Sequence, residues 1–211
     1  MRSITGIVRD PIAHATLLAV AILVAADASP CAAQGQRQSE GLYLRAGVGP
    51  SYAGTSVSTS TPSHPDYVLR GAGLSADFMI GGTPWLGIAV GGAASFSSFA
   101  LGHKPGTSSM WMLGPFVDGY PNDHNGLHLG GLLGVASVHT DRDDDVAELD
   151  AIGLGLAAWI GQDFFVGGDW SIGGMLRIKG ALARELTEGE DSVELSSASY
   201  EIALMLTALL F

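Results

Sequence analysis

The sequence has little of what disulfide-rich, zinc-binding and nucleic-acid-binding proteins need. Its 211 residues include one cysteine, Cys31, which excludes a disulfide framework and a cysteine-based zinc site. Only 15% of the residues are charged, against about a quarter in an ordinary soluble domain. Ten lysines and arginines stand against 21 aspartates and glutamates, which gives a net charge of −11. Because lysine and arginine supply most of the affinity for phosphate backbones, no nucleic-acid partner is expected.

The first 33 residues have the pattern of a cleavable secretory signal peptide. Two arginines precede the twelve-residue apolar stretch 15–26, and small residues lead up to Ala33. A membrane-spanning helix needs about 20 apolar residues, and aspartates bracket a shorter run here. We therefore expect cleavage after Ala33, with the segment 26–28 as a second possible site, a short linker at 34–40, and one domain over 41–211 that keeps the net charge of −11.

The remainder of the sequence is rich in glycine, and its bulky apolar residues alternate with small or polar residues at a period of two. In 71–81, for example, Leu74, Phe78 and Ile80 alternate with small or acidic residues such as Gly73 and Asp77. This alternation predicts β-strands. Eight such segments follow one another, at 42–49, 71–81, 86–96, 111–118, 127–136, 152–160, 171–182 and 198–211. The last is apolar on both faces, and its alanines and leucines would also suit a helix.

The connections alternate in length. The long ones are 54–66, 98–108, 139–149 and 184–197; the short ones are 81–84, 121–126 and 162–169, with glycine, proline and asparagine typical of turns. This alternation of long and short connections predicts an up-and-down antiparallel sheet with an even number of strands. Both ends of the chain are then expected on the side of the sheet that carries the short turns.

Two closed barrels fit eight such strands. A soluble barrel with its apolar face inside would leave long stripes of glycine and alanine in water. We therefore predict a transmembrane β-barrel, with the bulky apolar face in lipid and small or charged residues in the lumen. The expected lumen residues are Arg45, Asp77, Asp118, His128, Arg177, Lys179 and Glu201. We expect them to form an ion-pair network that narrows the barrel, because unpaired buried charge is costly. A proton or ion path with His128 as its switch is the alternative.

Outward aromatic residues are expected where the bilayer meets water. Tyr52, Phe96, Trp111 and Tyr200 lie beside the long loops, and Phe78 and Phe211 mark the other rim. With its export signal, alternating strands, long outer loops and final phenylalanine, the chain resembles the small outer-membrane barrels of the OmpA, OmpX and OmpW type. The resemblance implies a place in the outer membrane, contact with its lipid and lipopolysaccharide, and recognition of Phe211 by the barrel-assembly machinery. Phe211 shares a face with Glu201, so the last strand carries a bulge or has another register.

Two outer loops carry nine of the eleven excess negative charges. Within 141–150 the weak candidates for holding divalent cations are Asp141, Asp143, Asp144 and Asp145. An EF-hand is excluded, because Val146 replaces the glycine and Ile152 the closing glutamate that this loop needs.

These observations favour a structural or surface-interaction protein with acidic outer loops, a mostly plugged lumen and no cofactor. One alternative is a narrow channel or carrier for small apolar compounds, as the OmpW resemblance implies. A second is a lipid A-modifying enzyme, for which Ser137, His139 and Asp141 would share one face. No enzymatic activity is expected.

Overall fold

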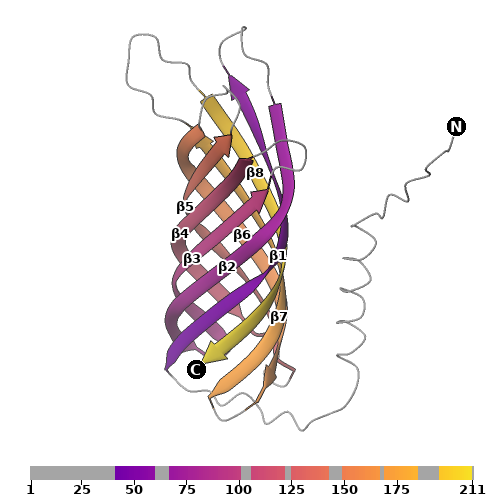
Figure 1. Ribbon diagram of the computed structural model, residues 1–211. Coiled ribbons are helices and arrows are strands. Elements are labelled where there is room, and N and C mark those ends of the chain that lie inside the picture. The colour runs from indigo at the N-terminus through magenta and orange to yellow at the C-terminus, as the bar shows by residue number, and fades with distance from the viewer. Residues whose placement is uncertain are drawn as a thin grey trace, which may run out of the picture. The chain divides into compact units, whose positions relative to one another are not determined.

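Eight strands form a closed antiparallel barrel (Figure 1). The computed structural model describes residues 41–59, 67–100, 106–121, 125–142, 149–166, 169–184 and 195–210. The predicted signal peptide 1–33, the predicted linker 34–40 and Phe211 lie outside these residues. The strands are Leu42–Thr59 (β1), Tyr67–Trp85 (β2), Ile88–Ala100 (β3), Gly106–Gly119 (β4), Leu127–Arg142 (β5), Leu149–Phe165 (β6), Trp170–Arg184 (β7) and Leu195–Leu210 (β8).

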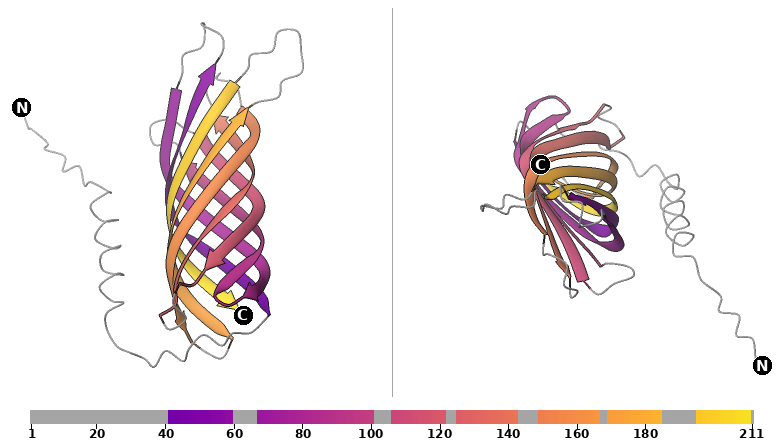
Figure 2. Two further views of the ribbon diagram at one scale, coloured as in Figure 1. Left: turned by 180° about the vertical axis from the view of Figure 1, so that it is seen from behind. Right: turned by 90° about the horizontal axis from the view of Figure 1, so that it is seen from above.

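Each strand pairs with the next along the chain, and β8 returns to pair with β1. Figure 2 shows the strands following one another round this closed wall. The predicted all-β, up-and-down barrel of eight strands is therefore confirmed, and the helical alternative for 198–211 is wrong. The register of β8 against β7 is continuous from Ser196 to Leu210, so no bulge appears on that side. The end of β8 lies at the same end of the barrel as the short connections (Figure 1).

The alternation of residue types becomes an alternation of faces, because successive side chains of a strand point to opposite sides. In β6, Leu154 and Leu156 are 67% and 62% exposed, whereas Gly155 between them and Ala157 after them are buried. The other strands repeat this pattern, with bulky apolar side chains outside and small or charged ones inside. An apolar outer wall is compatible with hydrocarbon only because closure satisfies the backbone hydrogen bonds.

The strands hold 13 to 19 residues each, more than the 9–11 or so that cross a bilayer. They also extend further into the connections than the sequence predicts, because serine- and threonine-rich ends such as Thr55–Ser58 are paired rather than looped. Across the described part of the chain, no helix is long and apolar enough to span a membrane.

The turn expected at 81–84 is misplaced. β2 continues to Trp85 through an irregularity after Gly82, and the chain reverses at Leu86–Gly87. Gly87 has a φ of 68°, a conformation that glycine adopts without steric cost. Pro84 is accommodated where the ladder is already irregular, as proline in a sheet requires.

Two prolines interrupt the ladder inside strands. The β1–β8 pairing skips Gly49 and Pro50, and the β4–β5 pairing skips Gly114 and Pro115. Both prolines point outward. Since proline has no backbone N–H, it cannot donate to a ladder. The two interrupted pairings, β1–β8 and β4–β5, lie on opposite sides of the barrel, because four strands separate them in either direction round the wall.

Candidate functional site

The interior of the barrel holds all seven charged or imidazole side chains that the sequence places there. Each is at most 7% exposed. They fall into two hydrogen-bonded groups at different heights. The short-turn network contains Tyr43, Arg45, Asp118, Tyr120, His128, Trp159 and Asp163; the mid-barrel network contains Ser75, Asp77, Ser95, Ser97, Arg177, Lys179 and Glu201.

Arg45 is the centre of the short-turn network. Its Nη2 donates to Oδ2 of Asp163 at 2.6 Å and to the hydroxyl of Tyr120 at 2.6 Å. Tyr120 in turn donates to the same Asp163 oxygen at 2.8 Å. Nη1 of Arg45 lies 2.7 Å from Nε2 of His128. One guanidinium from β1 thus joins groups from β5, from β6 and from the end of β4.

Asp118 is the best-coordinated group of this network. Its carboxylate accepts from the Tyr43 hydroxyl at 2.7 Å, from Nε1 of Trp159 at 3.0 Å and from Nδ1 of His128 at 3.1 Å. Because a guanidinium can only donate, Nε2 of His128 must accept from Arg45. Nη1 of Arg45 also lies 3.3 Å from Nδ1, so the imidazole lies between the Arg45 guanidinium and the Asp118 carboxylate.

The mid-barrel network contains two cations and two carboxylates. Arg177 donates to Asp77 through Nη1 and to Oε1 of Glu201 through Nη2, the latter at 2.8 Å. Lys179 lies 2.8 Å from Oε2 of Glu201 and donates to Ser95 and Ser97 at 3.1 Å. Ser75 accepts from Arg177 and donates to Glu201, both at 2.5 Å. Charge is balanced within this group.

The sequence reasoning missed Tyr120 and Asp163. The predicted connection 162–169 includes Asp163, and Tyr120 lies between the predicted segment 111–118 and the connection 121–126, because the strand ends are placed too early. The period of two that runs through Phe116 and Asp118 continues to Tyr120, and the same parity in β6 leads from Trp159 to Asp163. Extending the alternation by two residues beyond 118 and by three beyond 160 would have placed both side chains in the lumen.

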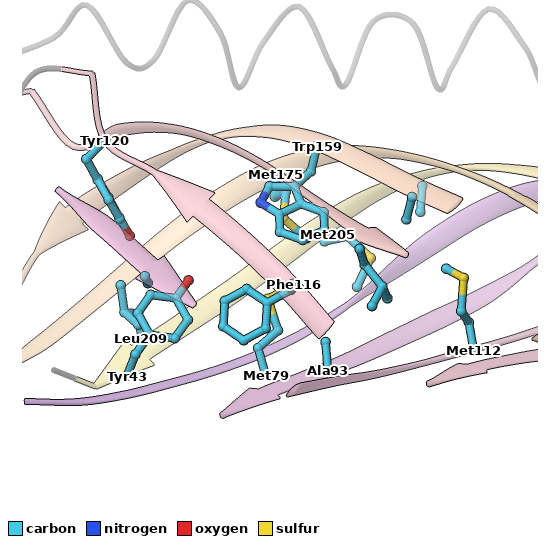
Figure 3. Close-up of a cluster of buried hydrophobic side chains, with 14 residues drawn as sticks. Tyr43, Met79, Ala93, Met112, Phe116, Tyr120, Trp159, Met175, Met205 and Leu209 are labelled. Carbon is cyan, nitrogen blue, oxygen red and sulfur yellow. The ribbon is translucent and has the colours of Figure 1, made fainter. Parts of the chain in front are cut away.

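Apolar side chains fill the interior around the two networks. Tyr43 and Phe116 pack with their ring centroids 5.5 Å apart. Met175 and Met205 face each other across β7 and β8, and Figure 3 shows them in the same cluster as Trp159. Five methionines of the described chain are buried inside: Met79, Met110, Met112, Met175 and Met205. Methionine suits such irregular space because its side chain is unbranched and flexible.

The outward aromatic residues lie on the lipid-facing wall. Tyr52, Trp111 and Tyr200 are 50%, 55% and 40% exposed, and Phe78 is 47% exposed. Phe96 is half-buried against Trp111, with ring centroids 4.4 Å apart. The aromatic residues nearest the short turns were missed, and they are Trp85, Phe164 and Trp170. Their position at strand ends would have identified them.

The candidate cation and enzyme residues lie near the other end of β5. Asp141 is exposed, whereas Asp143, Asp144 and Asp145 lie outside the described residues. Ser137, His139 and Asp141 share the outer face of β5, and Nδ1 of His139 lies 3.0 Å from Asp150 on β6. Among the residues that the structure describes, no three His, Cys, Asp or Glu side chains are grouped to hold a metal ion.

A closed barrel with an apolar exterior and a charged, hydrogen-bonded interior is a membrane-spanning β-barrel. The chain has the architecture of the small outer-membrane barrels, which places it in an outer membrane. This class rests on the closed ladder and the distribution of side chains between its two faces.

Comparison with solved structures finds other barrels of this class. Neisserial surface protein A is 13% identical, with 81% of this chain and 97% of that chain covered and a TM-score of 0.47. OprG from Pseudomonas aeruginosa is 13% identical, with coverage of 82% and 99% and a TM-score of 0.46. The outer membrane protein AlkL is 11% identical, with coverage of 81% and 90% and a TM-score of 0.45. No family model and no curated protein matches the sequence.

Proposed function

We propose that the protein is a sealed outer-membrane barrel with a structural or surface-interaction role. The observation that supports this is the occupation of the interior at two heights by networks whose charged members are buried. An eight-stranded barrel has an interior just wide enough for side chains. Side chains from several strands meet there, as Arg45 does with Asp163 and Arg177 with Asp77 and Glu201.

Sealing follows from the energy of these contacts. Arg177, Lys179 and Glu201 are each at most 3% exposed, so a solute passing their level would have to separate them. Separating a buried pair leaves an uncompensated charge, which costs about 3–5 kcal/mol. A barrier of this kind leaves the outer loops as the part of the protein that meets other molecules.

The acidic outer loops are the proposed interaction surface. The sequence from Asp141 to Asp150 and from Arg184 to Glu194 is strongly acidic. Solvated carboxylates at the outer rim favour divalent cations, including those that bridge lipopolysaccharide phosphates. Lipid, lipopolysaccharide and the assembly machinery are thus the proposed partners, the last through Phe211.

Recording from a planar bilayer tests the sealed interior. The purified protein should show no stable current steps, because both networks obstruct the lumen. A triple variant, Arg45→Ser with Arg177→Ser and Lys179→Ser, removes the cations of both networks and should raise the current above the wild-type level. Stable, large steps in the wild-type protein would instead support the narrow channel or carrier. Mass spectra of lipid A from cells with and without the protein separate the enzyme alternative.

A further inference from the structure

The exposed cations of the outer wall lie on neighbouring strands. Three of the described cationic side chains are buried in the lumen. The other two, Arg70 of β2 and Arg184 at the end of β7, are exposed on the outer wall near the long connections. The strands β7, β8, β1 and β2 follow one another round the barrel. On these four strands no described carboxylate lies on the outer wall, since the exposed Asp141 and Asp150 belong to β5 and β6. This sector of the outer rim therefore attracts anions.

Arg70 lies at the level where the bilayer meets water. In the β1–β2 ladder Tyr52 pairs with Ala72, and Gly54, two residues nearer the long connection, pairs with Arg70. Tyr52 and Tyr200 are half exposed on the lipid-facing wall, where aromatic residues mark the interface. The aliphatic part of an arginine side chain can lie along an apolar surface while its charged end stays in the polar layer. The guanidinium of Arg70 is therefore at the depth of the lipid headgroups.

The ring of Tyr200 lies across β1 in the direction of Arg70. Gly54 of β1 pairs with Tyr200 of β8 on one side and with Arg70 of β2 on the other, and the three strands are side by side in Figure 1. A β-carbon placed on Gly54 would lie 2.7 Å from Cε1 and Cζ of Tyr200 and 2.8 Å from its hydroxyl oxygen. The far end of the ring thus covers the glycine, which is buried although it faces outward. Because neighbouring strands are about 4.8 Å apart, the Tyr200 hydroxyl lies one strand away from Arg70.

Both polar groups are available to a ligand. In the described part of the chain, no hydrogen bond or ion pair joins the Arg70 guanidinium or the Tyr200 hydroxyl to another residue. At the edge of the hydrocarbon an anion stabilises a guanidinium more than it would in bulk water, because the dielectric constant is lower there. A guanidinium can donate two parallel hydrogen bonds to a phosphate, and a phenol hydroxyl can donate a third. The pair is therefore suited to a phosphate group.

The wall next to this pair indicates that the phosphate belongs to a lipid. From Arg70 toward the short turns, the outward side chains of β1 and β2 are apolar: Val48, Pro50, Ala72 and Leu74. Val48 and Leu74 are 55% and 64% exposed. A ligand with its phosphate at Arg70 would lay acyl chains along this surface, whereas a free phosphate would make no use of it.

We infer that Arg70 and Tyr200 bind a phosphate of the lipid A headgroup, whose acyl chains lie against β1 and β2. This inference rests on the proposed function, which makes lipopolysaccharide a partner, and it adds a second kind of contact. At the acidic loops a divalent cation is needed between two anions, whereas at Arg70 the guanidinium meets the phosphate directly. Chelation of divalent cations therefore separates the two contacts.

Native mass spectrometry of the folded protein, released from detergent micelles, tests this binding. Bisphosphorylated lipid A, dephosphorylated lipid A and phosphatidylglycerol are each titrated in the presence of EDTA. We expect the bisphosphorylated form to bind and the dephosphorylated form to bind at least about tenfold more weakly, because the charge-assisted hydrogen bonds are lost. Equal binding of phosphatidylglycerol would overturn the assignment to lipid A. Binding that EDTA abolishes would also overturn it, and would leave the cation contact of the acidic loops standing.

Three variants locate the binding. Arg70→Gln should weaken it about tenfold or more, and Tyr200→Phe, which loses one neutral hydrogen bond, about threefold. Arg184→Gln is the matched control, because it removes the same charge from the same sector, and Arg184 pairs with Ile152 and Ser196 rather than lying beside an aromatic ring. It should change binding less than about twofold. Unchanged binding in Arg70→Gln overturns the inference, as does an equal loss in Arg184→Gln, which would indicate general attraction to a positive surface. If Arg70→Gln does not fold, Tyr200→Phe against Arg184→Gln still decides.

Discussion

At the scale of single residues, the interior relies on charged groups that compensate one another. Arg177 contacts Asp77, Glu201, Ser75 and Ser95, all of them buried. Buried ion pairs often contribute little net stability relative to an apolar replacement of all partners. Removing only one partner is a different change, because the remaining charges stay buried without compensation.

Replacing Arg177 with methionine should therefore destabilise the barrel by about 3–5 kcal/mol. The methionine keeps much of the apolar volume, so the lost charge is the main change. Urea unfolding in lipid vesicles measures the difference. Arg70→Met is the matched control, because Arg70 is exposed on the outer face of β2, where such changes are usually within about 0.5 kcal/mol. Similar losses in both variants would show that the Arg177 contacts carry no special weight.

At the scale of the strands, glycine on the inner face lets neighbouring backbones approach closely. A β-carbon on Gly91 of β3 would lie 2.5 Å from the Cα of Gly81 and closer still to the carbonyl oxygen of Ile80. The next residue, Gly92, points outward, and a β-carbon there would have no atom within 4 Å. Two adjacent glycines thus have opposite tolerance for a side chain.

Gly91→Ala should cost about 1–3 kcal/mol, because the added methyl group forces β2 and β3 apart. Gly92→Ala should change the unfolding free energy by no more than about 0.5 kcal/mol, or raise it slightly by restricting the unfolded chain. The same urea titration compares the two. A larger loss for Gly92→Ala would contradict the assigned faces of β3.

The strands also show how far the sequence determines the structure. Period-two alternation predicted which face of each strand points inward, including that of β8, because a one-residue shift would exchange all buried and exposed side chains. Strand ends were less predictable. Pairing of Thr55–Ser58 with β2 and β8 is a long-range contact that local composition does not reveal. For the same reason the contact between Asp163 and Arg45, 118 residues away, could not be predicted, although the alternation itself leads to Asp163.

At the scale of the whole molecule, closure leaves no free edge. Every strand pairs with two neighbours, and β1, the first strand of the domain, pairs with β8, the last. Opening the barrel in a micelle or membrane exposes backbone groups for which hydrocarbon offers no partners. The barrier to unfolding is therefore expected to be high, and the folded state should persist in mild detergent.

Gel electrophoresis tests this persistence. A sample kept at room temperature in dodecyl sulfate should retain the compact barrel and migrate differently from a boiled sample, in which the chain is unfolded. The comparison uses one preparation with and without heating, so composition is held constant. Identical mobility over a range of detergent concentrations would contradict a kinetically stable barrel.

The placement of the methionines has a consequence for oxidative damage. The methionine side chains inside the barrel are each at most 2% exposed: Met79, Met110, Met112, Met175 and Met205. Peroxide or hypochlorous acid outside the cell therefore does not reach their sulfur atoms while the barrel is folded. Conversion to the sulfoxide makes this side chain polar, and the tightly filled interior could not readily accept it. Oxidation is therefore confined to chains that have already opened, which would then be unable to close again.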